Sequence, residues 1–238
     1  MESEEKALLS KISVEEISYG KSIKINTKQF DLPRCRIVVA RSGVGLVKAG
    51  ILLSLITEHL AVDAIVSLGV GGALDESLSV GDTVVAKQII QHDSISSSGG
   101  GDLLMAPGEL TLSAHPDEQV DPVMRSDSVL VEWIKSAIEV QKNGKVFEGT
   151  LLSGSEFVAS PLKKQALRKL FHDALLVDME AAALAQIARI LKIPFVVAKT
   201  VADRAKPQTS ISDDYKKFLE SAALHSSAVF QSLLKTFG

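Results

Sequence analysis

The chain of 238 residues has little of what several classes of protein require. Its one cysteine, Cys35, excludes an internal disulfide and a zinc site built from cysteines. No apolar run reaches the roughly 18–20 residues of a membrane-spanning helix, and the opening MESEEKALLS is acidic where a secretory signal peptide is basic. The formal net charge of −3 favours neither nucleic acid nor an anionic membrane as a partner. We therefore expect a cytoplasmic protein that binds neither.

What is present predicts one α/β domain over residues 1–238. Hydrophobic residues make up 46% of the chain and charged residues 23%, which is ordinary for a soluble globular protein. Strand-like runs lie at 14–26 (two strands around a Gly20-Lys21 turn), 35–40 (buried), 63–69, 82–90, 145–153, 174–179 and 194–202. Helix-like runs lie at 4–12, 43–60, 127–142, 161–171, 180–192 and 213–237. This alternation predicts a central mixed, largely parallel twisted sheet flanked by helices.

A polar stretch from about residue 92 to 126 interrupts the alternation. It contains SISSSGGGD and three prolines, so the sequence predicts a loop there. A loop of this length in a compact domain is usually functional, which makes it a candidate lid over a site. His92 begins this stretch and is a candidate contact to a ligand.

Three carboxylates lie where predicted strands end. Asp178 and Glu180 stand between an apolar strand and an apolar helix in LLVDMEAAALAQIA, and Asp203 follows the next strand. In sheets of this type, ligands bind outside the carboxyl ends of the strands. A helix cap would explain Asp178 and could cover Glu180. Separated carboxylates around a pocket are also what cleavage of a glycosidic bond needs, one as proton donor and one to orient water.

Glycine-rich segments end two further predicted strands. SLGVGGALD carries Gly69, Gly71 and Gly72, and the sequence predicts a turn there that lets a ligand approach the backbone. The segment LLSGSEFVAS adds Phe157 at the same edge. Known nucleotide signatures fail: GKS at 20–22 lacks the first glycine of a phosphate loop, and SGVGLVKAG reads as a tight turn into a helix. The five histidines show no metal-ligand spacing, so we expect no metal and no cofactor.

Several segments together resemble one family. SGVG (42–45), GVGGALDESLSVGDTVVA (69–86), SGSEFV (153–158), VDMEAAALA (177–185) and TVADRA (200–205) occur in the order and spacing of the nucleoside phosphorylase superfamily. Within it they are most similar to the 5′-methylthioadenosine/S-adenosylhomocysteine nucleosidases, and the resemblance covers nearly the whole chain. It implies an N-glycosidic hydrolase of methionine salvage that forms a homodimer in which the lid region reaches the neighbour's pocket.

The resemblance also implies roles for individual residues. Asp203 would protonate N7 of the purine, and Glu4 would activate the attacking water. Glu180 would bind the ribose hydroxyls, with Asp178 at the helix start behind it. The implied substrate-binding residues are Met179 and Glu180 at the ribose, Phe157 and the backbone of Val158 at the purine, Val44 and Tyr215 at the 5′ substituent, and Met1 and Val70.

The chain departs from the family pattern at four places. The strand that precedes the family's Met-Glu-x-Glu segment is absent before Met1. Val70 stands where the nucleosidases usually carry serine, and Ala202 replaces the serine before the catalytic aspartate. The lid motif is present only as His92-Asp93, followed by SISSSGGGD.

These departures leave alternatives for the function. Phosphorylases of the superfamily hold phosphate with an Arg-x-Gly-Ser strand end, whereas residues 67–70 read Ser-Leu-Gly-Val, and Arg41 is the nearby basic candidate. The sequence therefore favours hydrolysis of 5′-modified purine nucleosides with release of adenine. The alternatives are a nucleosidase of the futalosine or adenosylhopane type, a purine nucleoside phosphorylase, and a nucleoside-binding homologue without turnover.

Overall fold

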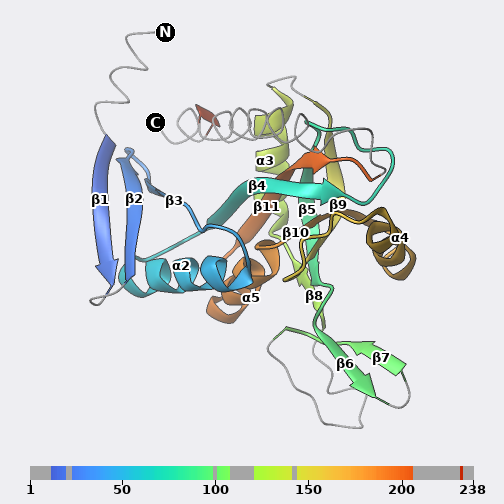
Figure 1. Ribbon diagram of the computed structural model, residues 1–238. Helices are drawn as coiled ribbons and strands as arrows, with labels where there is room; N and C mark the ends of the chain where they lie inside the picture. The colour runs from blue at the N-terminus through green and yellow to red at the C-terminus, as the bar shows by residue number, and fades with distance from the viewer. Residues whose placement is uncertain are drawn as a thin grey trace.

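The computed structural model describes residues 12–19, 23–98, 101–107, 121–140, 144–205 and 231–232, and a six-stranded sheet forms its centre (Figure 1). The strands are β4 (Ile65–Ala73), β5 (Thr83–Gln91), β8 (Val123–Arg125), β9 (Val146–Ser153), β10 (Ala174–Asp178) and β11 (Phe195–Asp203). Their order is β11-β4-β10-β9-β5-β8, and β11 also pairs with β5. Five of these strands therefore form a closed ring of paired neighbours.

The longest pairings in this sheet are parallel. β11 lies parallel to β4 along its whole length, from Phe195 beside Ile65 to Asp203 beside Gly72, and β5 lies parallel to β9. β10 is parallel to β9 but antiparallel to β4. β5 is antiparallel to both β11 and β8. The predicted mixed, largely parallel sheet flanked by helices is confirmed.

The helices pack on this sheet through apolar faces. They are α2 (Leu46–His59), α3 (Ser128–Glu139), α4 (Pro161–Leu170) and α5 (Ala181–Leu191). The small residues of α5 lie in the main core cluster against the strands, α2 packs on α5, and α3 forms a cluster with β5 and β11. None of the helices in these described ranges has the length and apolar character that crossing a bilayer requires.

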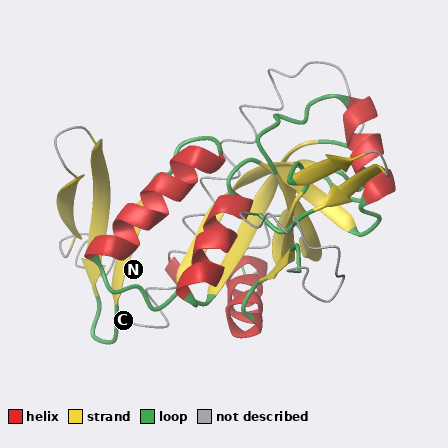
Figure 2. Ribbon diagram, turned by 90° about the horizontal axis from the view of Figure 1, so that it is seen from below, coloured by secondary structure: helices red, strands yellow, loops and turns green. Residues whose placement is uncertain are grey.

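A second, smaller sheet stands at one end of the molecule (Figure 1 and Figure 2). It consists of β1 (Ile12–Tyr19), β2 (Ile23–Asp31) and β3 (Arg36–Ala40). β1 and β2 pair antiparallel, which confirms the predicted pair of strands. The prediction that residues 35–40 form a buried strand is wrong, because β3 pairs with β2 in this small sheet and keeps exposed or partly exposed side chains.

The stretch from residue 92 to 126 is more regular than the sequence predicts. β6 (Ile95–Ser98) and β7 (Gly101–Leu104) pair as an antiparallel hairpin, which projects away from the main sheet (Figure 1). β8 then adds to the edge of β5. Short polar strands like Ile95–Ser98 carry too little apolar alternation to be predicted, because backbone pairing and not burial holds them.

The glycines of SLGVGGALD lie within β4 and not in a turn, which corrects that prediction. A Cβ on Gly69 would lie 2.9 Å from Lys199 Nζ, and one on Gly72 would lie 2.8 Å from Asp203 Oδ1. A Cβ on Gly71 would lie 2.0 Å from Leu176 Cδ2. The three glycines therefore make room for side chains from the two neighbouring strands, which bring charged groups against β4.

Replacing Gly71 by alanine is expected to lower the free energy of unfolding by about 1–3 kcal/mol, because the added methyl group overpacks a filled site. Gly50→Ala, in α2, is the matched control. Its Cβ would meet only Ile187 and Ala183, at 3.8 and 3.9 Å, so a gain of about 0.5–1 kcal/mol from helix propensity is expected there. Urea unfolding of both variants measures the contrast, and equal effects would contradict it.

Two predicted helices fall outside the structure's description. The segment 4–12 is described only at Ile12, which belongs to β1, and the segment 213–237 only at 231–232, which are helical.

Candidate functional site

The two strand-end carboxylates lie on either side of β4. Asp178 is the last residue of β10 and Asp203 is the last residue of β11. β4 runs between these strands, and its Gly72 pairs with Val177 on one side and with Asp203 on the other. Strands are about 4.8 Å apart, so the two acids are about two strand spacings from each other. The two acids therefore lie near each other, but β10 and β11 run in opposite directions, so their proximity does not come from parallel strands that end at one edge.

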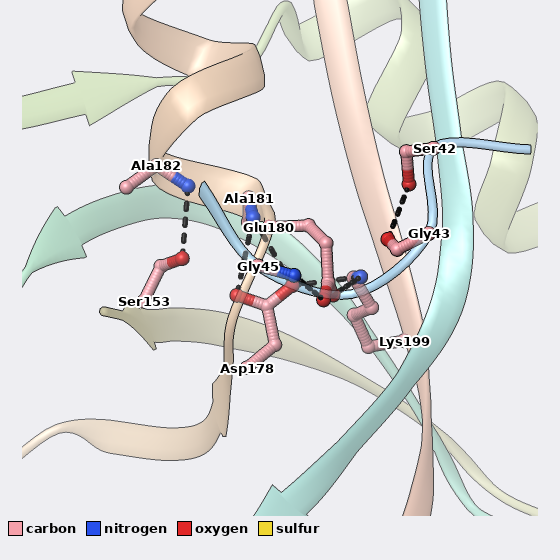
Figure 3. A network of polar contacts seen from close by, with 9 residues as sticks. All are labelled: Ser42, Gly43, Gly45, Ser153, Asp178, Glu180, Ala181, Ala182 and Lys199. Atoms are coloured by element: carbon pink, nitrogen blue, oxygen red, sulfur yellow. Dashed lines mark hydrogen bonds and ion pairs between the residues drawn. The ribbon is translucent and has the colours of Figure 1, made fainter. Parts of the chain in front are cut away.

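Asp178 and Glu180 share a buried lysine, Lys199, from β11 (Figure 3). The Lys199 Nζ lies 2.7 Å from Asp178 Oδ2 and 3.1 Å from Glu180 Oε2. Asp178 also accepts hydrogen bonds from the N–H of Ala181, at the start of α5. The Ser153 hydroxyl accepts one from the N–H of Ala182. The prediction of a helix-start role for Asp178 is thereby confirmed.

Lys199 is a residue that the sequence interpretation missed. Its side chain is only 3% exposed. Burial lowers its pKa, but the charges of Asp178 and Glu180 outweigh this and raise the pKa above the ordinary value. The signal in the sequence is that Lys199 is the single charge inside the apolar run PFVVAKTVA. A buried charge needs partners, and Asp178 and Glu180 supply them.

Glu180 is held from a second direction by the loop before α2. The Gly45 N–H donates to Glu180 Oε1 at 3.0 Å. Gly45 has a φ of 101°, in the region that favours glycine. Glycine at this position therefore lets the backbone adopt the conformation in which its N–H points at Glu180. Gly43 has a φ of 75°, and α2 begins at Leu46, which confirms the predicted tight turn into a helix. Val44 lies between these glycines with an exposed side chain.

Asp203 is paired on one oxygen only. Oδ2 accepts from Lys164 Nζ of α4 at 2.7 Å. Oδ1 is buried, and no partner among the described residues reaches it. The register between β11 and β4 shifts between Val201 and Asp203, which makes Ala202 the extra residue of a β-bulge. Bulges of this kind re-aim a side chain next to a site, and here the bulge precedes the candidate acid.

The other predicted binding residues lie in segments that border these acids. Phe157, in the loop after β9, exposes 78% of its surface, whereas Val158 is buried. Met179, between Asp178 and Glu180, and Val70, in β4, are partly buried. The predicted site residues outside the described ranges are Met1, Glu4 and Tyr215.

His92 is buried at the end of β5, against the loop that begins with Gly154. A Cβ on Gly154 would lie 2.4 Å from His92 Nε2, so glycine leaves the room that the ring occupies. Nε2 is buried, and no partner among the described residues reaches it. Burial lowers the pKa of His92; among weaker effects, Asp93 raises it and Lys163 lowers it.

This burial makes stability depend on pH. An unfolded histidine titrates near pH 6.5, so below about that pH the unfolded chain takes up a proton that buried His92 resists. We therefore expect the free energy of unfolding to fall as pH drops from 7.5 to 5.5. Urea unfolding across this range should show a smaller fall for His92→Gln. His172→Gln, at an exposed histidine, is the control and should match the wild type.

Among the described residues, no group of three or more histidine, cysteine or acidic side chains is arranged to hold a metal ion. The cations nearest the acids are the side chains Lys164 and Lys199, which are also the buried lysines of the described residues. Two lysines therefore face three carboxylates, so side chains of the chain itself offset most of the negative charge of the site.

Comparison with known proteins places this arrangement in context. A sequence profile described as "Phosphorylase superfamily" matches residues 1–235. A 5′-methylthioadenosine/S-adenosylhomocysteine nucleosidase of Staphylococcus haemolyticus is 32% identical over 227 residues, which cover 95% of this chain and 90% of that protein.

Solved structures give the same result. The nucleosidase of the same description from Neisseria meningitidis, in complex with methylthio-immucillin-A, superposes with a TM-score of 0.77 at 30% identity. The match covers 99% of this chain and 96% of that one. A futalosine hydrolase from Helicobacter pylori has a TM-score of 0.74 at 24% identity, covers 99% and 94% of the two chains, and shows the shared fold alone.

Proposed function

Because the chain belongs to the phosphorylase superfamily, we propose that it hydrolyses the N-glycosidic bond of 5′-modified purine nucleosides and releases adenine. The substrates are of the methylthioadenosine and S-adenosylhomocysteine type, as the name of the 32%-identical relative implies. The observation that carries the proposal is how two acids, Asp203 and Glu180, are held. Asp203 keeps a buried, unpartnered oxygen, and Glu180 is held rigidly by Lys199 and Gly45.

In the proposed reaction Asp203 gives its proton to N7 of the purine. The bond between C1′ and N9 then breaks, and its electron pair leaves with the purine. The oxygen of a water molecule bonds to C1′, and the proton that this water gives up replaces the one lost by Asp203. Glu4, the predicted base for this water, remains a prediction because it lies outside the described residues.

Glu180 is the proposed ligand of the ribose hydroxyls. A carboxylate oxygen has two lone pairs, and each oxygen of Glu180 has one contact in the described part of the chain, to Gly45 or to Lys199. The remaining lone pairs can accept from hydroxyl groups. Holding the sugar in a fixed geometry converts binding into rate acceleration. The exposed ring of Phe157 and the backbone of Val158 are proposed to contact the purine.

Water rather than phosphate is the proposed attacking group. Holding phosphate requires cations or N–H donors that are not already committed. Lys199 is shared between Asp178 and Glu180, and Lys164 is paired with Asp203. Both buried lysines near the acids therefore neutralise carboxylates.

Adenine release from methylthioadenosine and S-adenosylhomocysteine, measured with and without inorganic phosphate, tests this function. We expect equal rates in both conditions and a free 5′-substituted ribose as the second product. A requirement for phosphate and a ribose 1-phosphate product would establish phosphorolysis instead. Binding of both nucleosides without release of adenine would identify a homologue without turnover.

The 5′ substituent is the part of the proposal with a second candidate. The hairpin β6–β7 occupies the stretch where the family carries its lid motif, and Ile95 and Leu103 on it are exposed. A lid of different composition favours a different 5′ group, as in nucleosidases of the futalosine or adenosylhopane type. Competition assays with nucleosides that differ only at the 5′ position will distinguish these substrates.

A homodimer is also part of the proposal. Exposed apolar side chains lie just before α2, at Val44, and within it, at Val47 and Ile51. The hairpin β6–β7 projects from the main sheet (Figure 1), as a segment that reaches a neighbour would. Exposed apolar patches of this kind mark association surfaces. Sedimentation velocity at micromolar concentration should give the mass of a dimer, and a monomer would contradict this.

A further inference from the structure

The proposed acid, Asp203, forms an ion pair with a buried lysine of α4. Lys164 is only 3% exposed, and its Nζ donates to Asp203 Oδ2 at 2.7 Å and to the backbone oxygen of Arg204 at 2.9 Å. The amine also lies against β4, since a Cβ on Gly72 would be 3.5 Å from it. Lys164 therefore reaches from α4 to the point where β4 and β11 carry the acid.

Fold stability alone does not require a charge at this position. Removing an ammonium group from water is costly, and a buried ion pair often stabilises a fold no better than apolar residues of similar size. α4 already binds its surroundings through other cations, because Lys163 pairs with Glu156 and Arg168 pairs with Asp75. Among the ion pairs of the described residues, Lys164 is the cation of α4 that pairs with Asp203.

The contact also separates the two oxygens of the acid. Oδ2 is occupied by the lysine, whereas Oδ1 is buried and has no partner among the described residues. A carboxyl group rotated about its Cβ–Cγ bond would present either oxygen to a substrate. The lysine removes this freedom and fixes the orientation of the carboxyl group.

We propose that Lys164 is a positioning residue for the reaction: it orients Asp203 and stabilises the carboxylate that Asp203 becomes. As the O–H bond of the carboxyl group breaks, the proton passes to N7 of the purine and the electron pair of the bond stays on the carboxyl group. The Lys164 ammonium, 2.7 Å from Oδ2, offsets this new negative charge. A fixed charge that meets a charge developing in the transition state lowers the barrier.

The inference rests on the proposed nucleosidase function and is tested by the steady-state kinetics of Lys164→Met. Without the cation we expect kcat to fall about 10- to 100-fold, part of what a general acid contributes. KM should change little, because the cation acts on a charge that develops only in the transition state. Lys164→Arg keeps the charge and should recover most of the lost kcat.

Lys163→Met is the matched control, since it removes the neighbouring lysine of the same helix, whose partner is Glu156. It should leave both kcat and KM unchanged. An unchanged kcat in Lys164→Met, with adenine release by the wild type intact, would overturn this inference and leave the function standing. Wild-type protein without adenine release would overturn both. Should Lys164→Met not fold, Lys164→Gln serves the same comparison.

Discussion

Asp203→Asn is expected to release adenine about 10²–10⁴ times more slowly than the wild type, the usual contribution of a general acid. Asparagine has nearly the same shape but no acidic proton to give to the purine. Its amide oxygen can still accept from Lys164 Nζ, which lies 2.7 Å from Asp203 Oδ2. We therefore expect the loss in kcat with little change in KM or in the unfolding midpoint. Steady-state kinetics and urea unfolding on the same preparations measure both.

Asp75→Asn is the control for this variant. Asp75 also pairs with a cation of α4, Arg168, but at a separate point just beyond β4. Its loss should affect stability and not the rate of bond cleavage. If Asp203→Asn retained wild-type turnover, the acid of the reaction would have to be another group.

Lys199→Met is expected to lower the free energy of unfolding by about 3–5 kcal/mol, the usual cost of breaking a buried ion pair. The Asp178 side chain is fully buried and the Glu180 side chain only 15% exposed, so both would be left with uncompensated charge. Glu180 would also lose one of its two anchors, and adenine release should fall with it. Urea unfolding measures the first effect and kinetics the second.

A double variant separates the charge from the packing. Asp178→Asn removes the more deeply buried carboxylate, so Lys199→Met should cost less in that background than alone. Equal costs in both backgrounds would contradict the ion pair. The raised pKa of Lys199 gives a further sign: its pairing stabilises the fold below about pH 10.4, the unfolded value for lysine, and this stability is lost as pH rises past the folded value.

The elements that hydrophobic periodicity defines were predictable. Strands β4, β5, β9, β10 and β11 and helices α2 to α5 lie where the apolar patterns place them, because a residue's neighbours along the chain decide whether one face or both can be buried. The exposure of residues 35–40 and the polar hairpin after His92 were not predictable. Both depend on which strand lies alongside, and a local pattern does not contain that information.

Some residues of the site could likewise be predicted from the sequence, and others could not. That Asp178 and Asp203 end strands could be predicted from the apolar runs before them, but their proximity depends on strand pairing, because β10 runs antiparallel to β4 and β11 runs parallel to it. Lys199 left a signal as the one charge in an apolar strand. Lys164 left none, since α4 reads as an ordinary amphipathic helix with several cations. Only the packing of α4 shows which of its lysines is buried.

The sequence by itself determined the fold class and the family, because these follow from residue types and their order along the chain. Only the tertiary structure decided how the charges are paired. Asp178 and Glu180 meet Lys199 from another strand, and Asp203 meets Lys164 from a helix 39 residues away. The glycines of β4 were misread as a turn for the same physical reason: the side chains that fill their space come from the neighbouring strands.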